Sequence, residues 1–202
     1  MAAVTVSRQL GSLGTHIARE AAERLGYRMV WREVINEAAR RSGAPEAALA
    51  MIDDLGLLGV DLRPEALRAY QQAVREVMDD LTAEGSVIIV GRAGQIILKD
   101  RSDVLHVRVI APLTLRVERT AALQEIPATA AQAQVVRSDR TRRVYLKRCH
   151  GVDWNDPQLY DLVLSTQRLT VAVATDLICR AVARVLEGGD AGTPGEGEPG
   201  LG

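Results

Sequence analysis

Five short runs of mainly β-branched and aliphatic residues alternate with longer amphipathic stretches, and this alternation limits the possible folds more than any other feature of the chain. The β-type runs are residues 3–7, 27–31, 86–90, 104–110 and 161–165. Strands that alternate with helices pair in parallel through right-handed crossovers. We therefore expect an α/β fold with a five-stranded parallel sheet between helical layers, whose ligand crevice lies beyond the carboxyl ends of the strands.

Helices are predicted between these runs from apolar residues at helical spacing. The first begins after a Gly-containing loop and ends at Gly26, and the second spans 32–41 and ends before Gly43. Further helices are expected over an apolar stripe from Leu67 to Leu81, after Pro112, over 129–148 and over 171–186. Residues 44–63 have an uneven pattern broken by glycines, and we interpret them as an inserted, partly mobile helical region.

The length of 202 residues allows one sizeable hydrophobic core and is short for two. We predict one domain over residues 1–187. Residues 188–202 are mainly Gly, Pro and acidic residues with almost nothing to bury, so we expect a disordered tail.

Composition narrows the choice of function. A net charge of −1, the absence of Phe and a total aromatic content of 3% disfavour a nucleic-acid surface built on base stacking. We find no signal-peptide pattern and no apolar run long enough to span a membrane, so we expect a cytoplasmic protein without membrane contact. Cys149 and Cys179 lack metal-site spacing and are interpreted as reduced thiols without a metal.

The loop after the first strand, residues 8–15, is the first candidate binding element. A phosphate is bound by backbone N–H groups at a helix N-terminus, by glycines that permit close approach, and by a cation. Candidates for these contacts are Arg8, Gly11, Ser12, Gly14 and Thr15, although no Lys follows the loop glycines as in GxxxxGK[ST]. The alternative is an ordinary strand-to-helix turn in which Ser12 or Thr15 is the N-cap.

Two basic elements are further candidates. Arg92 follows Gly91 at the end of the central strand, where a guanidinium can bind a phosphate through two hydrogen bonds. Residues 137–148 contain six basic side chains in twelve positions, which is typical of an Arg-rich lid over polyphosphate. A surface ion pair for Arg92, and a solvated helix or a nucleic-acid patch for the basic segment, are the alternatives.

Read together, these segments resemble the cytidylate kinase-like family of P-loop kinases over nearly the whole length, to about Leu186. The resemblance depends on three stretches of the sequence: residues 7–12 with 17–18, residues 87–92 with 97–98 and 104–107, and the run Gly151-Val152-Asp153-Trp154-Asn155-Asp156-Pro157 followed by residues 160–166.

The resemblance implies a three-layer P-loop NTPase fold with a helical monophosphate-binding insertion and an Arg-rich lid. It implies transfer of the γ-phosphoryl group from Mg²⁺-bound ATP to a nucleoside monophosphate, CMP or dCMP first among them, with small-molecule nucleotides as the binding partners. By position, Arg8, Gly11, Ser12, Gly14 and Thr15 would face the donor phosphates, with Arg119 nearby. The residues expected at the acceptor are Arg32, Arg92, Asp139 and Arg142.

The sequence departs from the family at several of these positions. Gly14 stands where cytidylate kinases have the loop Lys, His16 where they have a hydroxyl, and Leu13 where the family usually keeps a Gly. Trp31 replaces an Asp, and Ala93 replaces an acid. A second hypothesis is therefore a degenerate P-loop domain that senses nucleotide or binds a protein partner without turnover.

Overall fold

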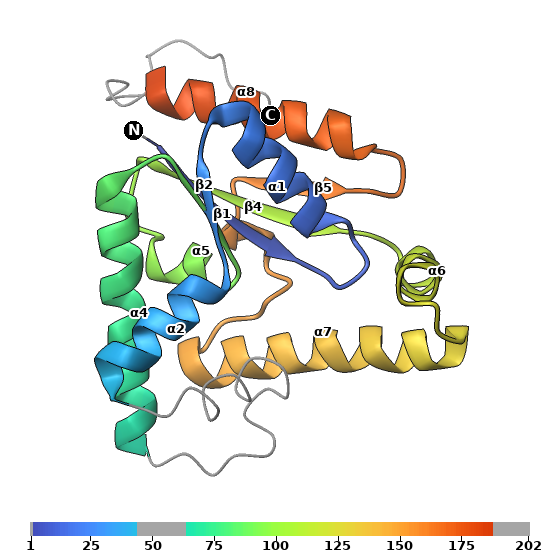
Figure 1. Cartoon of the computed structure of the whole chain (residues 1–202), viewed down its shortest axis with the longest axis horizontal. Coiled ribbons are helices and arrows are strands. Elements are labelled where there is room, and N and C mark those ends of the chain that lie inside the picture. The colour runs from blue at the N-terminus through green and yellow to red at the C-terminus, as the bar shows by residue number, and fades with distance from the viewer. Residues whose placement is uncertain (1, 44–63, 188–202) are drawn as a thin grey trace, which may run out of the picture.

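The chain folds around a five-stranded sheet in which every strand pairing is parallel. The computed structural model describes residues 2–43 and 64–187, and the strand order is β2-β3-β1-β4-β5 (Figure 1). The strands are β1 (Ala3–Arg8), β2 (Arg28–Val30), β3 (Val87–Val90), β4 (Val104–Ile110) and β5 (Leu162–Ser165). All five lie within a residue or two of the β-type runs in the sequence, so the predicted α/β fold with a parallel sheet is confirmed.

Helices cover both faces of the sheet and form the two outer layers (Figure 1). On one face, α1 (Gly14–Leu25) and α8 (Val171–Glu187) share a core cluster with alternate residues of β1, β3 and β4. On the other, α2 (Arg32–Ser42), α4 (Pro64–Glu84) and α5 (Gly94–Ile97) pack around a second cluster. The two helices α6 (Leu113–Gln124) and α7 (Ala128–His150) pack against each other through a third, smaller cluster, and the C-terminal part of α7 also reaches the second.

The two faces of β1 and β4 differ in character, and this difference locates the site. Val4 and Val6 enter the apolar cluster under α1 and α8. The alternating residues on the opposite face include Thr5 and Ser7, which lie level with His106 and Arg108 of β4. A parallel sheet covered on both faces is usually apolar on both, so four buried polar side chains toward the carboxyl ends of two adjacent strands indicate a specialised region.

Most predicted helix ends are also observed. Gly26 and Gly43 are left-handed C-caps of α1 and α2, and Pro112 is the N-cap of α6. The single-turn helix α5 was not predicted. The inserted region 44–63 and the tail 188–202 lie outside the described residues. Within the described ranges, no helix combines the length and the apolar character needed to cross a bilayer.

The structure corrects the N-cap that the sequence suggested for α1. The N-cap is Leu13, with φ 64° and no side-chain capping bond, and neither Ser12 nor Thr15 takes that role. The Ser12 hydroxyl instead donates to the carbonyl of Gln9 at 2.8 Å and is fully buried. A branched aliphatic residue in the left-handed region is uncommon and costs about 1–2 kcal/mol.

Candidate functional site

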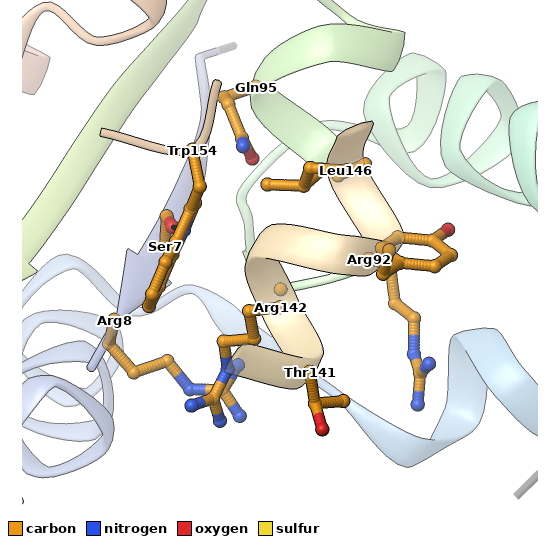
Figure 2. A pocket seen from close by; sticks show the side chains of 11 residues that line it. Ser7, Arg8, Arg92, Gln95, Thr141, Arg142, Leu146 and Trp154 are labelled. Atoms are coloured by element: carbon orange, nitrogen blue, oxygen red, sulfur yellow. Dashed lines mark hydrogen bonds between the residues drawn. The ribbon is translucent and has the colours of Figure 1, made fainter. Parts of the chain in front are cut away.

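A cavity lies beyond the carboxyl ends of β1 and β3 and is closed on one side by α7. It encloses about 530 Å³ of space that is partly open to solvent, and three arginines from three different elements line it: Arg8, Arg92 and Arg142. Figure 2 shows these side chains around the cavity together with Ser7, Thr141 and Trp154. The cavity thus occupies the position that the parallel sheet predicts for a ligand.

The charge of this lining has one sign. Among the described residues that line it, the only ionisable side chains with a full charge are the three guanidinium groups. A concave site with low-dielectric walls concentrates the field of such charges and raises the local concentration of anions. Since a guanidinium also presents a planar fork to phosphate oxygens, the chemistry that fits this cavity is the binding of a phosphorylated small molecule.

Arg8 reaches the cavity because two glycines leave room for it. A Cβ at Gly14 would lie 2.5 Å from the Cβ of Arg8, and a Cβ at Gly91 would lie 2.8 Å from its Nη1 atom. The Arg8 side chain therefore runs from the end of β1 past the start of α1 to the end of β3. Its Cζ atom also lies 5.1 Å from the ring centroid of Trp31, within the range of a cation–π contact.

The backbone at the end of β3 is left-handed over three successive residues. The φ angles are 84° at Gly91, 57° at Arg92 and 57° at Ala93. Left-handed non-glycine residues persist where the surrounding structure fixes them, and they cluster at binding and catalytic sites. Arg92, in the middle of this turn, lines the cavity, and α5 starts immediately after Ala93.

Trp154 forms one wall of the cavity and is fixed by polar contacts. Its indole Nε1–H donates to the Ser7 hydroxyl at 2.9 Å, and the ring is 2% exposed. Arg108 of β4 lies 4.5 Å from the ring centroid, donates to Asn155 at 2.8 Å and reaches the Tyr160 hydroxyl at 3.3 Å. The run 151–157, one of the stretches on which the family resemblance depends, therefore supplies a wall of the cavity through Trp154.

Arg108 was not identified from the sequence. An arginine inside a mainly apolar strand, at the position that pairs with Ser7, is the signal that could have found it. Its contacts hold Trp154 and Asn155 against the sheet, and the side chain is 4% exposed and does not line the cavity.

The loop between β1 and α1 is held by contacts from two other segments. The Thr166 hydroxyl donates to the carbonyl of Ser12 at 3.0 Å, and Arg119 donates to both the hydroxyl and the carbonyl of Thr166 at 2.8 and 2.9 Å. Gly11 packs so closely on α6 that a Cβ there would lie 2.5 Å from the carbonyl oxygen of Arg116. Gly11, Ser12 and Arg119 are thus brought together around the loop, beside Gly14 and Thr15 at the start of α1.

Two residues expected at the acceptor lie outside the cavity lining. Asp139 pairs with Arg116 of α6, at 2.8 Å between Oδ2 and Nη2. Arg32 is exposed at the start of α2, with its Cζ atom 5.6 Å from the Trp31 ring. Of the predicted acceptor residues, the structure therefore brings Arg92 and Arg142 into one cavity and places Asp139 and Arg32 elsewhere.

A second cavity adjoins the first and was not anticipated from the sequence. It lies between α4, α5 and α7, encloses about 750 Å³ of partly open space, and shares Tyr145 with the first cavity. Arg68 and Arg75 line it, with Gln71 and His150. The combined lining offers room and hydrogen-bonding groups for a ligand larger than a phosphate.

The chain is similar in sequence or in fold to several known proteins. A relative named cytidylate kinase from Pyrococcus horikoshii is 26% identical over 197 residues, which cover 98% of this chain and 96% of that protein. The solved structure of an uncharacterized protein from Eubacterium ventriosum aligns with a TM-score of 0.71 at 18% identity, covering 91% of this chain and 99% of the other. A gluconokinase from Sinorhizobium meliloti aligns with a TM-score of 0.55 at 12% identity, covering 92% and 94%.

The first structural match shares the α/β fold of this chain, and the second shows that this fold is like that of a gluconokinase of the P-loop kinase type. The sequence profile of the cytidylate kinase-like family matches residues 3–168, more than three quarters of the chain. That range includes all three cavity arginines, the left-handed turn after β3 and the Trp154 wall. The chain belongs to the cytidylate kinase-like family.

Proposed function

We propose that the protein transfers the γ-phosphoryl group of ATP to a nucleoside monophosphate, with CMP or dCMP as the first candidates. The observation that carries the proposal is the convergence of Arg8, Arg92 and Arg142 in one cavity at the carboxyl ends of the strands. Membership of the cytidylate kinase-like family and the relatives named cytidylate kinase support the choice of acceptor.

We assign a role to each residue from its place around the cavity. Arg92 and Arg142 bind the acceptor phosphate, and the nucleoside extends past Tyr145 toward the second cavity. The donor phosphates lie at the start of α1, beside the loop that Arg119 and Thr166 hold. Arg8 lies between these two regions and offsets charge on the transferred group.

The proposed reaction needs no general base and no covalent intermediate from the protein. Phosphoryl transfer proceeds in line through a loose transition state, so catalysis consists mainly of positioning the reactants and stabilising negative charge. Mg²⁺ would neutralise part of the charge of the donor phosphates, and these phosphates would themselves hold it, because no cluster of three His, Cys, Asp or Glu side chains within the described residues offers a metal cage. Water is excluded when the Arg-rich helix α7 covers the cavity.

A second candidate function is nucleotide binding or partner binding without turnover. The observation that favours it is the donor loop, where Gly14 replaces the expected Lys and Leu13 occupies a left-handed N-cap. Loss of one preorganised charge-stabilising group can lower the rate of an enzyme by about a hundredfold or more.

The deciding experiment measures acceptor-dependent ADP formation from Mg²⁺-ATP with CMP, dCMP, UMP, AMP and GMP. We expect turnover with a pyrimidine monophosphate, and its loss in Arg92→Ala and Arg142→Ala. Arg140→Ala is the matched control, because Arg140 is exposed on the same helix and does not line the cavity. If ATP stays intact with every acceptor while the folded protein still binds nucleotide, phosphoryl transfer is rejected in favour of the second candidate.

A further inference from the structure

Arg8, one of the three arginines that line the cavity, lies against the aromatic ring of Trp31. Trp31 lies between the end of β2 and the start of α2, and the Cζ atoms of Arg8 and Arg32 lie 5.1 and 5.6 Å from its ring centroid. Both distances fall within the range in which a guanidinium is attracted to the face of an indole. Trp31 thus connects the lining of the cavity with the N-terminus of α2.

Trp31 is itself held from two sides. Its ring is half-buried and packs against the apolar cluster formed by β1, β3, α1 and α8. Its backbone N–H donates to the Glu33 carboxylate at 2.9 Å, which fixes the N-cap of α2. A ring anchored in this way can restrict a flexible arginine that lies against it, and fewer rotamers then have to be given up when a ligand binds.

The path of Arg8 explains why the loop can lack a lysine. Any side chain at position 14 would begin 2.5 Å from the Cβ of Arg8 and 3.1 Å from the Cβ of Val109. The space that a side chain at position 14 would take is therefore occupied by Arg8, whose guanidinium lies over Gly91. The absence of a lysine at position 14 and the path of the Arg8 side chain therefore depend on each other.

We propose that Trp31 is a positioning residue, whose ring holds the Arg8 guanidinium in the cavity so that Arg8 supplies the fixed positive charge for polyphosphate that a loop lysine would otherwise supply. This inference rests on the proposed function for the identity of the ligand. It also concerns binding alone, so it can be tested in the absence of turnover.

The test is a double-mutant cycle on the affinity for inorganic tripolyphosphate, measured by titration calorimetry at low ionic strength. A cation–π contact near the surface is worth about 0.5–1 kcal/mol, so Trp31→Leu is expected to weaken binding about two- to fivefold. Trp31→Phe keeps an aromatic face and should lose less. In an Arg8→Ala background, Trp31→Leu should have no further effect.

Three results would overturn the inference: wild-type protein that does not bind tripolyphosphate, unchanged affinity in Trp31→Leu, or an equal loss with and without Arg8. Circular dichroism of each variant shows whether it is folded, and Trp31→Met, which also lacks an aromatic face, replaces Trp31→Leu in the cycle if Trp31→Leu unfolds. ADP formation is measured in parallel. Coupling between Trp31 and Arg8 without ADP formation would refute the proposed phosphoryl transfer and support the inference about Trp31. ADP formation without coupling would support the proposed transfer and refute the inference about Trp31.

Discussion

The Arg116 guanidinium on α6 donates to both carboxylate oxygens of Asp139 on α7, at 3.1 and 2.8 Å, and the two side chains are only 5% and 14% exposed. Arg116 also donates to the carbonyls of Ala111 and Leu10, at 3.0 and 3.4 Å. One buried arginine therefore connects the basic helix α7 to the loop that follows β1. The pair sets the position from which Arg142, one turn further along α7, reaches the cavity.

Removing the carboxylate of this pair should strongly destabilise the protein. Breaking a buried ion pair by deleting one partner costs about 3–5 kcal/mol, because a charge stays buried without its counterion. The remaining carbonyl contacts of Arg116 moderate the loss, so we expect Asp139→Ala to lower the free energy of unfolding in urea by about 3 kcal/mol. Asp176→Ala breaks the exposed pair with Arg180 and should cost less than about 0.5 kcal/mol. Equal effects of the two substitutions would contradict a structural role for Asp139.

Relieving the left-handed N-cap of α1 should stabilise the protein. A leucine at φ 64° costs about 1–2 kcal/mol, and glycine costs about 0.5–1 kcal/mol in extra chain entropy on folding. Leu13→Gly is therefore expected to raise the free energy of unfolding by about 0.5–1 kcal/mol. Leu13→Ala keeps the left-handed strain and should give no gain. A loss of stability in Leu13→Gly would show that the leucine side chain contributes more through packing than its backbone costs.

The sequence predicts the sheet and the long helices because their apolar periodicity is strong. The boundaries of β4 are those expected from the run 104–110, and α4 contains the whole apolar stripe from Leu67 to Leu81. The helix α5 could not be found in this way, since it has four residues and its start depends on the left-handed turn at 91–93. Periodicity carries no information about such a turn.

The cavity was predictable in part. Arg8 and Arg92 follow strands, so their meeting at the carboxyl edge of the sheet follows from a parallel topology. The partner of Asp139 depends on how α6 and α7 pack, and the burial of Arg108 depends on the loop that carries Trp154. Both are tertiary relationships between segments far apart in the chain, which helix and strand periods do not encode.

Stability should fall as the pH is lowered below about 6.5. Burial lowers the pKa of His106, against the opposing influence of the Asp161 carboxylate, and burial with the nearby Arg75 charge lowers the pKa of His150. In the unfolded chain these histidines have a pKa near 6.5, so below that pH they bind protons in the unfolded state before they do so in the folded state. The free energy of unfolding therefore decreases as the pH falls, until the pH is below the folded-state pKa. Urea unfolding at pH 7.5 and 5.5 should show this decrease in wild type and less of it in His106→Gln.

Gly91 should be required for the position of Arg8 as well as for the turn. At φ 84°, backbone strain destabilises an alanine by about 1–2 kcal/mol. The alanine Cβ would also lie 2.8 Å from the Arg8 Nη1 atom. We expect Gly91→Ala to lower both the free energy of unfolding and the affinity for tripolyphosphate. Gly26→Ala is the matched control, because Gly26 has φ 66° and no atom within 4 Å of the added Cβ. The control should therefore lose stability by a similar backbone strain and keep its affinity. A loss of affinity in both variants would mean that reduced stability, and not displacement of Arg8, weakens binding.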